Sequence, residues 1–190
     1  MNPRPDASNL SNQFLIAMPG MVDENFAGTV VFVCEHSPRG ALGLIINRPS
    51  DITVQELFER VGLPHAGPHA TQPVLQGGPV QTERGFVLHE ATNTPYASTL
   101  EIPGGLQMTT SKDVLEHMAA GDGPTRYLIA LGYSGWNAGQ LEEEIGNNGW
   151  LTVEADPAVM FDTPIEARFN AAMALLGFNP AMLSQTAGHA

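Results

Sequence analysis

VVFVCEHSPRGALGLIINRP, residues 30–49, contains two aliphatic runs separated by Ser-Pro-Arg-Gly. Runs rich in β-branched residues on either side of a short segment with Pro and Gly are typical of a β-hairpin. We therefore expect strands over residues 30–34 and 41–46. Pro38 fits the second position of a type I turn, and Gly40 fits the left-handed residue of a three-residue loop with a bulge.

This hairpin gives the single cysteine of the chain a core position. In the expected register Ser37 lies opposite Ala41, and Cys34 lies opposite Leu44. Because side chains alternate along a strand, Cys34 shares its face with Phe32, Leu44 and Ile46. The other face is equally apolar, which is typical of a strand pair in the middle of a sheet.

Outside the hairpin, short strands outnumber helices. Further strands are expected at 14–18, 74–76, 85–89, 99–102, 126–132 and 150–153, and helices at 53–61, from 111, at 138–145 and at 163–176. Three of the helices begin with capping signals: the boxes Thr53 to Glu56 and Thr163 to Glu166, and Asn137 with Gln140. Ser111 is expected to cap the fourth helix. Short strands joined by tight turns predict an α+β fold with a mixed, largely antiparallel sheet.

Length and composition indicate one domain over residues 1–190, with 1–12 and 179–190 as loose tails. The net charge of -12 includes only eight Lys and Arg, which do not cluster. DNA and RNA binding therefore becomes an unfavourable interpretation, as does an anionic membrane surface. A single cysteine and an N-terminus without an apolar run predict a cytoplasmic protein.

Cys34 and His36 are the first candidates for chemistry. Alternation places them on one strand face, where a thiolate and an imidazole could interact. The apolar neighbours of Cys34 would raise the pKa of its thiol, whereas a reactive cysteine needs exposure and positive charge nearby. We therefore interpret Cys34 as structural, and a redox role is the second interpretation.

The segment LGYSGWNAGQLEEE, residues 131–144, is the second candidate. Gly132 to Trp136 resembles the nucleophile elbow G-x-S-x-G, but Trp136 replaces the small closing residue. A plainer explanation is that Asn137 caps the following helix while Trp136 packs on Leu141. The start of this helix could also bind an anion together with Arg48, although any turn from strand to helix offers that feature.

The sequence predicts neither a metal site nor a cofactor. His65 and His69 have Gly67 and Pro68 between them, and there is no phosphate-binding loop or dinucleotide fingerprint. What remains is a set of polar residues at the ends of strands and turns, which are candidate binding residues if the turns converge. They are Asn47, Arg48, Gly77, Gly78, Arg84, His89, Ser111, Tyr133 and Trp136. Each also has an ordinary structural explanation, such as a cap, a strand end or a surface ion pair.

A series of segments resembles one known family. FLIAMPGM, FVCEH, GALGLIINRP, QGGPV, RGFVLHE, MTTSKDVLE and ALGYSGWNAGQLEEEIGNNGWL follow in the family's order, and the chain ends in AGHA. From about Gln13 to Ala190 the chain is similar to the AlgH family, the YqgE-like bacterial proteins of largely uncharacterised function. The resemblance implies an α+β domain whose branched sheet curls into a pseudo-barrel, with short helices packed around it.

The resemblance also carries a label, transcriptional regulator, that rests on a regulatory association more than on a DNA-binding motif. It supplies no catalytic residues, and the family accepts alanine at the position of Ser134 and valine at that of Cys34. The leading hypothesis is therefore a non-enzymatic regulatory or binding module. It would recognise a protein or a small molecule through Asn47-Arg48, Gly77-Gly78 and Tyr133 to Trp136. The alternative is a hydrolase or thiol-dependent enzyme that uses Ser134 or Cys34 with a histidine.

Overall fold

The structure, a computed structural model, describes residues 9–177 of the chain. Its strands are β1 Gln13–Ala17, β2 Val30–Ser37, β3 Gly40–Ile45, β4 Pro49–Thr53, β5 Pro73–Gln76, β6 Val80–Glu90, β7 Thr99–Ile102, β8 Leu106–Thr109, β9 Tyr127–Asn137 and β10 Trp150–Glu154. The α-helices are α1 Val54–Arg60, α2 Asp113–Ala119, α3 Gln140–Gly146, α4 Pro157–Phe161 and α5 Arg168–Leu175. Two 3₁₀ helices complete the list, η1 Gly67–His69 and η2 Ile165–Ala167.

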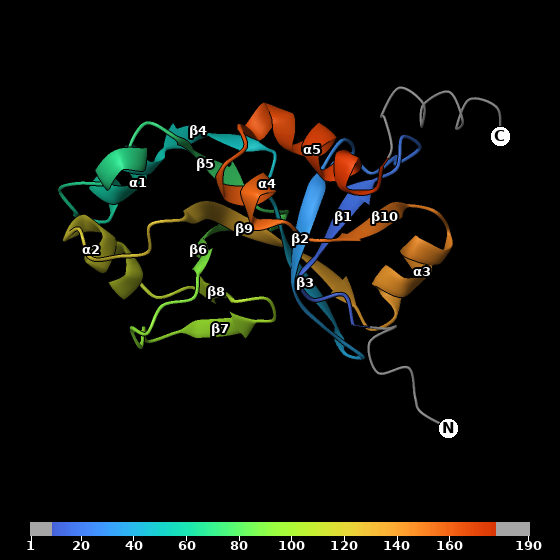
Figure 1. The fold of residues 1–190 in the computed structure, drawn as a ribbon, viewed down its shortest axis with the longest axis horizontal. Helices are drawn as coiled ribbons and strands as arrows, with labels where there is room; N and C mark the ends of the chain where they lie inside the picture. The colour runs from blue at the N-terminus through green and yellow to red at the C-terminus, as the bar shows by residue number, and fades with distance from the viewer. Residues whose placement is uncertain (1–8, 178–190) are drawn as a thin grey trace.

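One branched sheet organises the fold. Its strand order is β10-β1-β2-β3-β9-β6-β8-β7, and β4 and β5 form a branch in which β5 runs parallel to β9. Strand β9 joins the two wings: β1, β2, β3 and β10 lie on one side, and β6, β7 and β8 on the other (Figure 1). The α+β class and the curled, largely antiparallel, branched sheet are confirmed.

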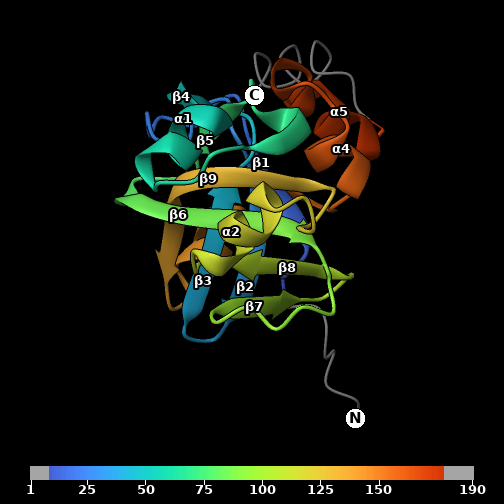
Figure 2. The same ribbon diagram turned by 90° about the vertical axis from the view of Figure 1, so that its left-hand side faces the viewer.

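Three apolar clusters hold the layers together. The largest lies inside the curl of the sheet, where α4 and α5 pack against β1, β2 and β9. A second lies between the outer face of β5, β6 and β9 and the helices α1 and α2, both of which lie on the side that faces the viewer in Figure 2. The third joins α3 to the outer face of β1, β2, β3 and β10. Both faces of the central strands are thus buried, as their continuous aliphatic sequences predict.

The hairpin is present, but its expected register is wrong. Ser37 pairs with Gly40, and a bulge between Val33 and Glu35 leaves Cys34 without a direct partner. Gly40 has φ +138 and pairs with Asn137, and a Cβ on it would lie 2.2 Å from the Trp136 carbonyl oxygen. The close approach of the β9 backbone, which leaves no room for a side chain, therefore explains why residue 40 is a glycine. The expected face of Cys34 is confirmed, because Cys34 shares the inner cluster with Phe32, Leu44 and Ile46. His36, expected on the same face, instead bonds to Glu142 of α3, which packs on the outer face.

Three helix starts differ from the expected ones, whereas Thr53 caps α1 as expected. Strand β9 continues to Asn137 because its last residues pair with β3, and Gly139 becomes the N-cap of α3. Ser111 bonds to the Ser98 N–H and to Asp113, and Lys112 is the N-cap of α2. The segment 163–176 begins as η2, and the hydroxyl of Thr163 donates to the Ala158 carbonyl.

The expected tails lie mostly outside the described residues, which leave out 1–8 and 178–190. Residues 9–12, also expected to be loose, are fastened to the sheet: the Leu10 N–H donates to His36 Nδ1, and the Asn12 N–H donates to the Val33 carbonyl. Over residues 9–177, no helix has the length and apolar composition needed to span a membrane.

The wings meet at a junction of small residues, which we call the branch point: Gly77, Gly78, Gly132 and Ser134. The Gly77 N–H donates to the Leu131 carbonyl, and the Gly77 carbonyl accepts from Ile45 N–H. A Cβ on Gly77 would lie 2.3 Å from the Gly132 carbonyl oxygen, and a Cβ on Gly78 2.2 Å from that of Tyr133. Only glycine lets three backbones approach this closely.

Candidate functional site

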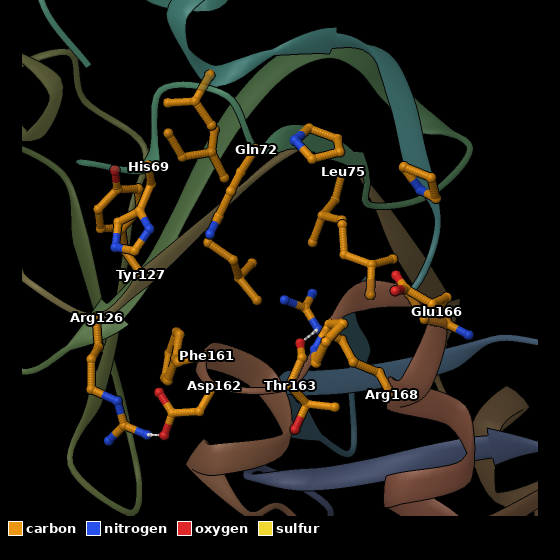
Figure 3. Close-up of a pocket in the computed structure, with 18 of the residues that line it drawn as sticks. His69, Gln72, Leu75, Arg126, Tyr127, Phe161, Asp162, Thr163, Glu166 and Arg168 are labelled. Carbon is orange, nitrogen blue, oxygen red and sulfur yellow. Dashed lines mark hydrogen bonds and ion pairs between the residues drawn. The ribbon is translucent and has the colours of Figure 1, made fainter. Parts of the chain in front are cut away.

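A cavity of about 700 Å³ opens between the sheet and the segment that carries α4 and α5 (Figure 3). Its walls come from the first residues of β9, from β5 and the loop before it, and from residues 161–168. Exposed residues such as Gln72 and Asp162 lie at its rim, so the cavity is accessible from solvent.

Most of the wall is apolar or aromatic. Leu75 and Ile129 are buried side chains of the sheet that line the cavity. His69 and Tyr127 meet edge to face with ring centroids 5.2 Å apart, and Phe161 lies across the hollow from Leu75 in Figure 3. Burial raises the pKa of Tyr127 to about 12, so its hydroxyl is neutral at physiological pH.

Two arginines line this cavity, and their surroundings differ. Arg126 forms ion pairs with Glu90, at 3.1 Å, and with Asp162, and its guanidinium lies 5.5 Å from the centroid of Phe161. The hydrogen bond with Asp162 raises the pKa of Arg126. The positive charge of Arg126 is thus matched by two carboxylates of the chain itself.

Arg168 is only 7% exposed, and its hydrogen bonds go to backbone carbonyls. Its Nε donates to the Thr163 carbonyl at 3.0 Å, and its Nη1 donates to the Ile46 carbonyl at 2.6 Å. Burial lowers the pKa of Arg168 to about 10, and the nearby charge of Glu166 acts in the opposite direction. The side chain therefore stays a cation at neutral pH, with its guanidinium facing the hollow (Figure 3).

Of the nine candidate binding residues from the sequence, Asn47 lines this cavity. Its amide is already engaged, because Oδ1 accepts from the Val30 N–H and Nδ2 donates to the Gly28 carbonyl. Arg48 donates to the carbonyls of Asn25 and Ala27, so its guanidinium supports that loop and does not join an anion site at α3.

Other candidates lie around two shallow hollows on the concave side of the sheet. Arg84 and Tyr133 line one of them, and Tyr133 and Trp136 line the other. Trp136 is nevertheless buried among the side chains under α3, and its indole N–H donates to Glu144. These residues do not share a pocket with Asn47.

Gly77 and Gly78 form the branch point, and Ser111 supports the loop before α2. His89 is fully buried, with Nδ1 2.8 Å from the Glu90 carbonyl oxygen and Nε2 2.8 Å from Thr109 Oγ1. Burial lowers the pKa of His89, so the ring is neutral: Nδ1 donates and Nε2 accepts. Each hydrogen-bonding atom of this imidazole is satisfied inside the fold.

The two nucleophile candidates are enclosed. Cys34 is 1% exposed, and burial raises the pKa of its thiol. The bulge separates Cys34 from His36. The Nδ1 of His36 accepts a hydrogen bond from the Leu10 N–H, and its Nε2 pairs with Glu142 of α3. The bond to His36 lowers the pKa of Glu142. Ser134 has no exposed surface, and its hydroxyl donates to the Gly77 carbonyl at 3.1 Å. It lies within β9, so the strand-to-helix turn of a nucleophile elbow is absent at this position.

Sequence reasoning missed the residues that matter most at the cavity, Arg168 and its surroundings. A signal was present: Arg168 falls three residues after Ile165 and four before Ala172, both on the apolar stripe of the last helix. A charge on a buried stripe is unusual and needs a partner. The cavity itself depends on contacts between β5, β9 and residues 161–168, which local patterns do not encode. No cluster of three metal-ligating side chains forms among residues 9–177.

Comparisons with known proteins agree on one family. The AlgH-like family profile matches residues 14–181. A UPF0301 protein of Ralstonia nicotianae is 65% identical over 188 residues, which cover 98% of each chain. The solution structure of the AlgH protein from Pseudomonas aeruginosa is 50% identical, with a TM-score of 0.79 over 97% of each chain. A crystal structure of a protein from Corynebacterium diphtheriae, 20% identical, shares the fold with a TM-score of 0.74 over 92% of this chain and 91% of that one. The chain belongs to the AlgH-like family.

Proposed function

We propose that this chain is a non-enzymatic binding module with a regulatory role, and that it holds a small ligand in the cavity beneath α4 and α5. One observation carries the proposal: an open cavity of about 700 Å³ has a wall of apolar and polar side chains and a buried arginine facing it. Small-molecule sites are typically concave, mostly apolar and about 300–1,000 Å³ in volume, with a few convergent polar groups.

The position of the cavity supports a regulatory role. A ligand there would contact β5, β9 and the segment from Phe161 to Arg168 together. It would therefore favour arrangements in which α4 and α5 stay packed on the sheet, and such a shift can change how a partner is bound. We expect this partner to be a protein, because a net charge of -12 opposes binding to nucleic acid.

A fragment screen tests the proposal. Binding of neutral and charged aromatic fragments would be followed by amide NMR on the wild-type protein and on Gln72→Trp. Gln72 is an exposed residue whose side chain lies at the cavity, so a tryptophan there should fill the hollow without disturbing the core. Gln76→Trp is the matched control, because Gln76 is exposed at the end of β5 and does not line the cavity.

We expect fragments to shift amide signals around the cavity in wild-type protein and Gln76→Trp, and to lose binding in Gln72→Trp. Bound fragments should also be recovered chemically unchanged. Failure of every fragment to bind in the cavity, or equal binding by both tryptophan variants, would contradict the proposal.

A further inference from the structure

The cavity contains a positive charge that the described part of the chain does not neutralise. Within residues 9–177, Arg168 has no carboxylate within ion-pair distance, whereas Arg126 in the same cavity has two. The third nitrogen of Arg168, Nη2, donates to no described residue, and it is open to solvent, since it is not one of the buried polar atoms without a partner. The guanidinium is thus largely buried and keeps one donor nitrogen open to the cavity.

This arrangement leaves one donor of a largely buried cation available to a ligand in the cavity. A buried charge is normally paired, because removing it from water is costly and a carbonyl only partly replaces that hydration. Only 7% of the Arg168 surface is exposed, and its guanidinium faces an open hollow and not a packed core. The planar fork of an arginine fits the two oxygens of a carboxylate or phosphate, so an oxyanion would supply the missing partner.

We propose that the cavity binds a ligand with an oxyanion group, a carboxylate or a phosphate, attached to an apolar body, and that Arg168 receives the oxyanion. This inference rests on the proposed function, that the cavity holds a small ligand. The body of the ligand would lie among Leu75, Ile129, Tyr127 and Phe161, which are apolar or aromatic residues of the wall.

The other charged groups at the cavity limit the charge of the ligand. Asp162 is occupied by Arg126, and Glu166 is an exposed carboxylate at the rim that interacts with Arg168 through space. A ligand with several negative charges would therefore meet repulsion from Glu166. A single oxyanion at the end of an apolar group fits better than a polyanion such as a nucleic acid.

Three matched probes test the ligand class on the intact chain: phenylacetate, its neutral counterpart phenylacetamide, and phenyl phosphate. We expect phenylacetate or phenyl phosphate to bind wild-type protein about tenfold more tightly than phenylacetamide, because hydrogen bonds to charged groups are the stronger ones. The better of the two anions identifies the headgroup. Dissociation constants from calorimetry or from amide NMR titration would measure the difference.

Arg168→Met should remove the preference for the anions and leave the binding of phenylacetamide unchanged. Arg168→Lys keeps the charge without the planar fork, so it should retain part of the preference. Arg60→Met is the control, since Arg60 is an exposed residue of α1 that does not line the cavity, and it should bind all three probes as wild type does.

Equal affinity of wild-type protein for phenylacetamide and for both anions would overturn this inference and leave the proposed function standing. That comparison needs no variant, so it holds even where Arg168→Met does not fold. An anion preference that persists in Arg168→Met would also overturn it. Failure of every fragment, charged or neutral, to bind in the cavity would overturn both proposals.

Discussion

The branch point lies within the sheet and the Arg168 cavity lies against it, and the two regions illustrate different uses of small and polar residues. At the branch point, Gly77, Gly78 and Gly132 allow close backbone contacts, and the Ser134 hydroxyl finds its acceptor on Gly77. At the cavity, a buried guanidinium faces open space with two carbonyls as its only described partners. A motif whose hydrogen bonds are complete supports the fold, whereas a costly group left incomplete beside a cavity indicates a ligand.

The largest expected effect concerns Cys34, which reports on the closed core beside the branch point. Cys34 packs in the inner cluster with Leu44, and a Cδ of Leu44 lies 3.1 Å from where a Gly77 Cβ would be. Because the thiol is buried and its pKa is raised, a neutral thiol reagent should label native protein at least about 10³-fold more slowly than unfolded protein.

The rates would be compared across pH 5 to 9, with urea-unfolded protein as the reference. Rapid labelling of native protein would mean that Cys34 is accessible. It would reopen the redox interpretation and contradict the enclosed core described above.

Gly77→Ala should have the next largest effect. Its new Cβ would lie 2.3 Å from the Gly132 carbonyl oxygen, a backbone atom that cannot move without shifting β9. We expect a loss of about 3 kcal/mol or more in the free energy of unfolding, measured by urea denaturation.

Gly85→Ala in β6 is the matched control, because no heavy atom lies within 4 Å of its added Cβ. Its unfolding free energy should stay within about 0.5 kcal/mol of that of the wild type. Equal stability of the two alanine variants would show that the branch point tolerates side chains and is not a close-packed junction.

Ser134→Ala should have a smaller effect. It removes one hydrogen bond to the Gly77 carbonyl, which keeps its bond from Ile45 N–H, so the expected cost is about 1 kcal/mol. Fragment binding at the cavity should not change. Loss of an activity or of ligand binding in a variant that is otherwise folded would instead assign Ser134 a role in function.

The strands and their faces could be predicted because aliphatic alternation and turn residues are local properties of the sequence. The hairpin register could not, because nothing local marks the bulge at Cys34, and Gly40 pairs with Asn137 of β9, about one hundred residues further along the chain. Likewise, the local sequence of GYSGW predicts a turn before a helix, whereas pairing with β3 keeps the segment extended.

The candidate site was harder to predict than the fold. The sequence predicts binding residues among the polar side chains at turns and strand ends. Most of these side chains instead complete hydrogen bonds within the fold, as Asn47, Arg48 and His89 do. Arg168 was detectable only as a charge on the apolar stripe of the last helix. The other residues of the cavity wall, among them Tyr127 and Phe161, are brought together by tertiary contacts alone.

The free energy of unfolding of Arg168→Met, measured by urea denaturation without added ligand, tests the central claim most directly. If the charge serves a ligand, removing it relieves a buried cation, and water in the open cavity can solvate the Ile46 and Thr163 carbonyls. We predict a stability within about 1 kcal/mol of that of the wild type. A loss of about 3 kcal/mol or more, comparable to that of Gly77→Ala, would show that Arg168 is a structural residue like those of the branch point and would contradict the account.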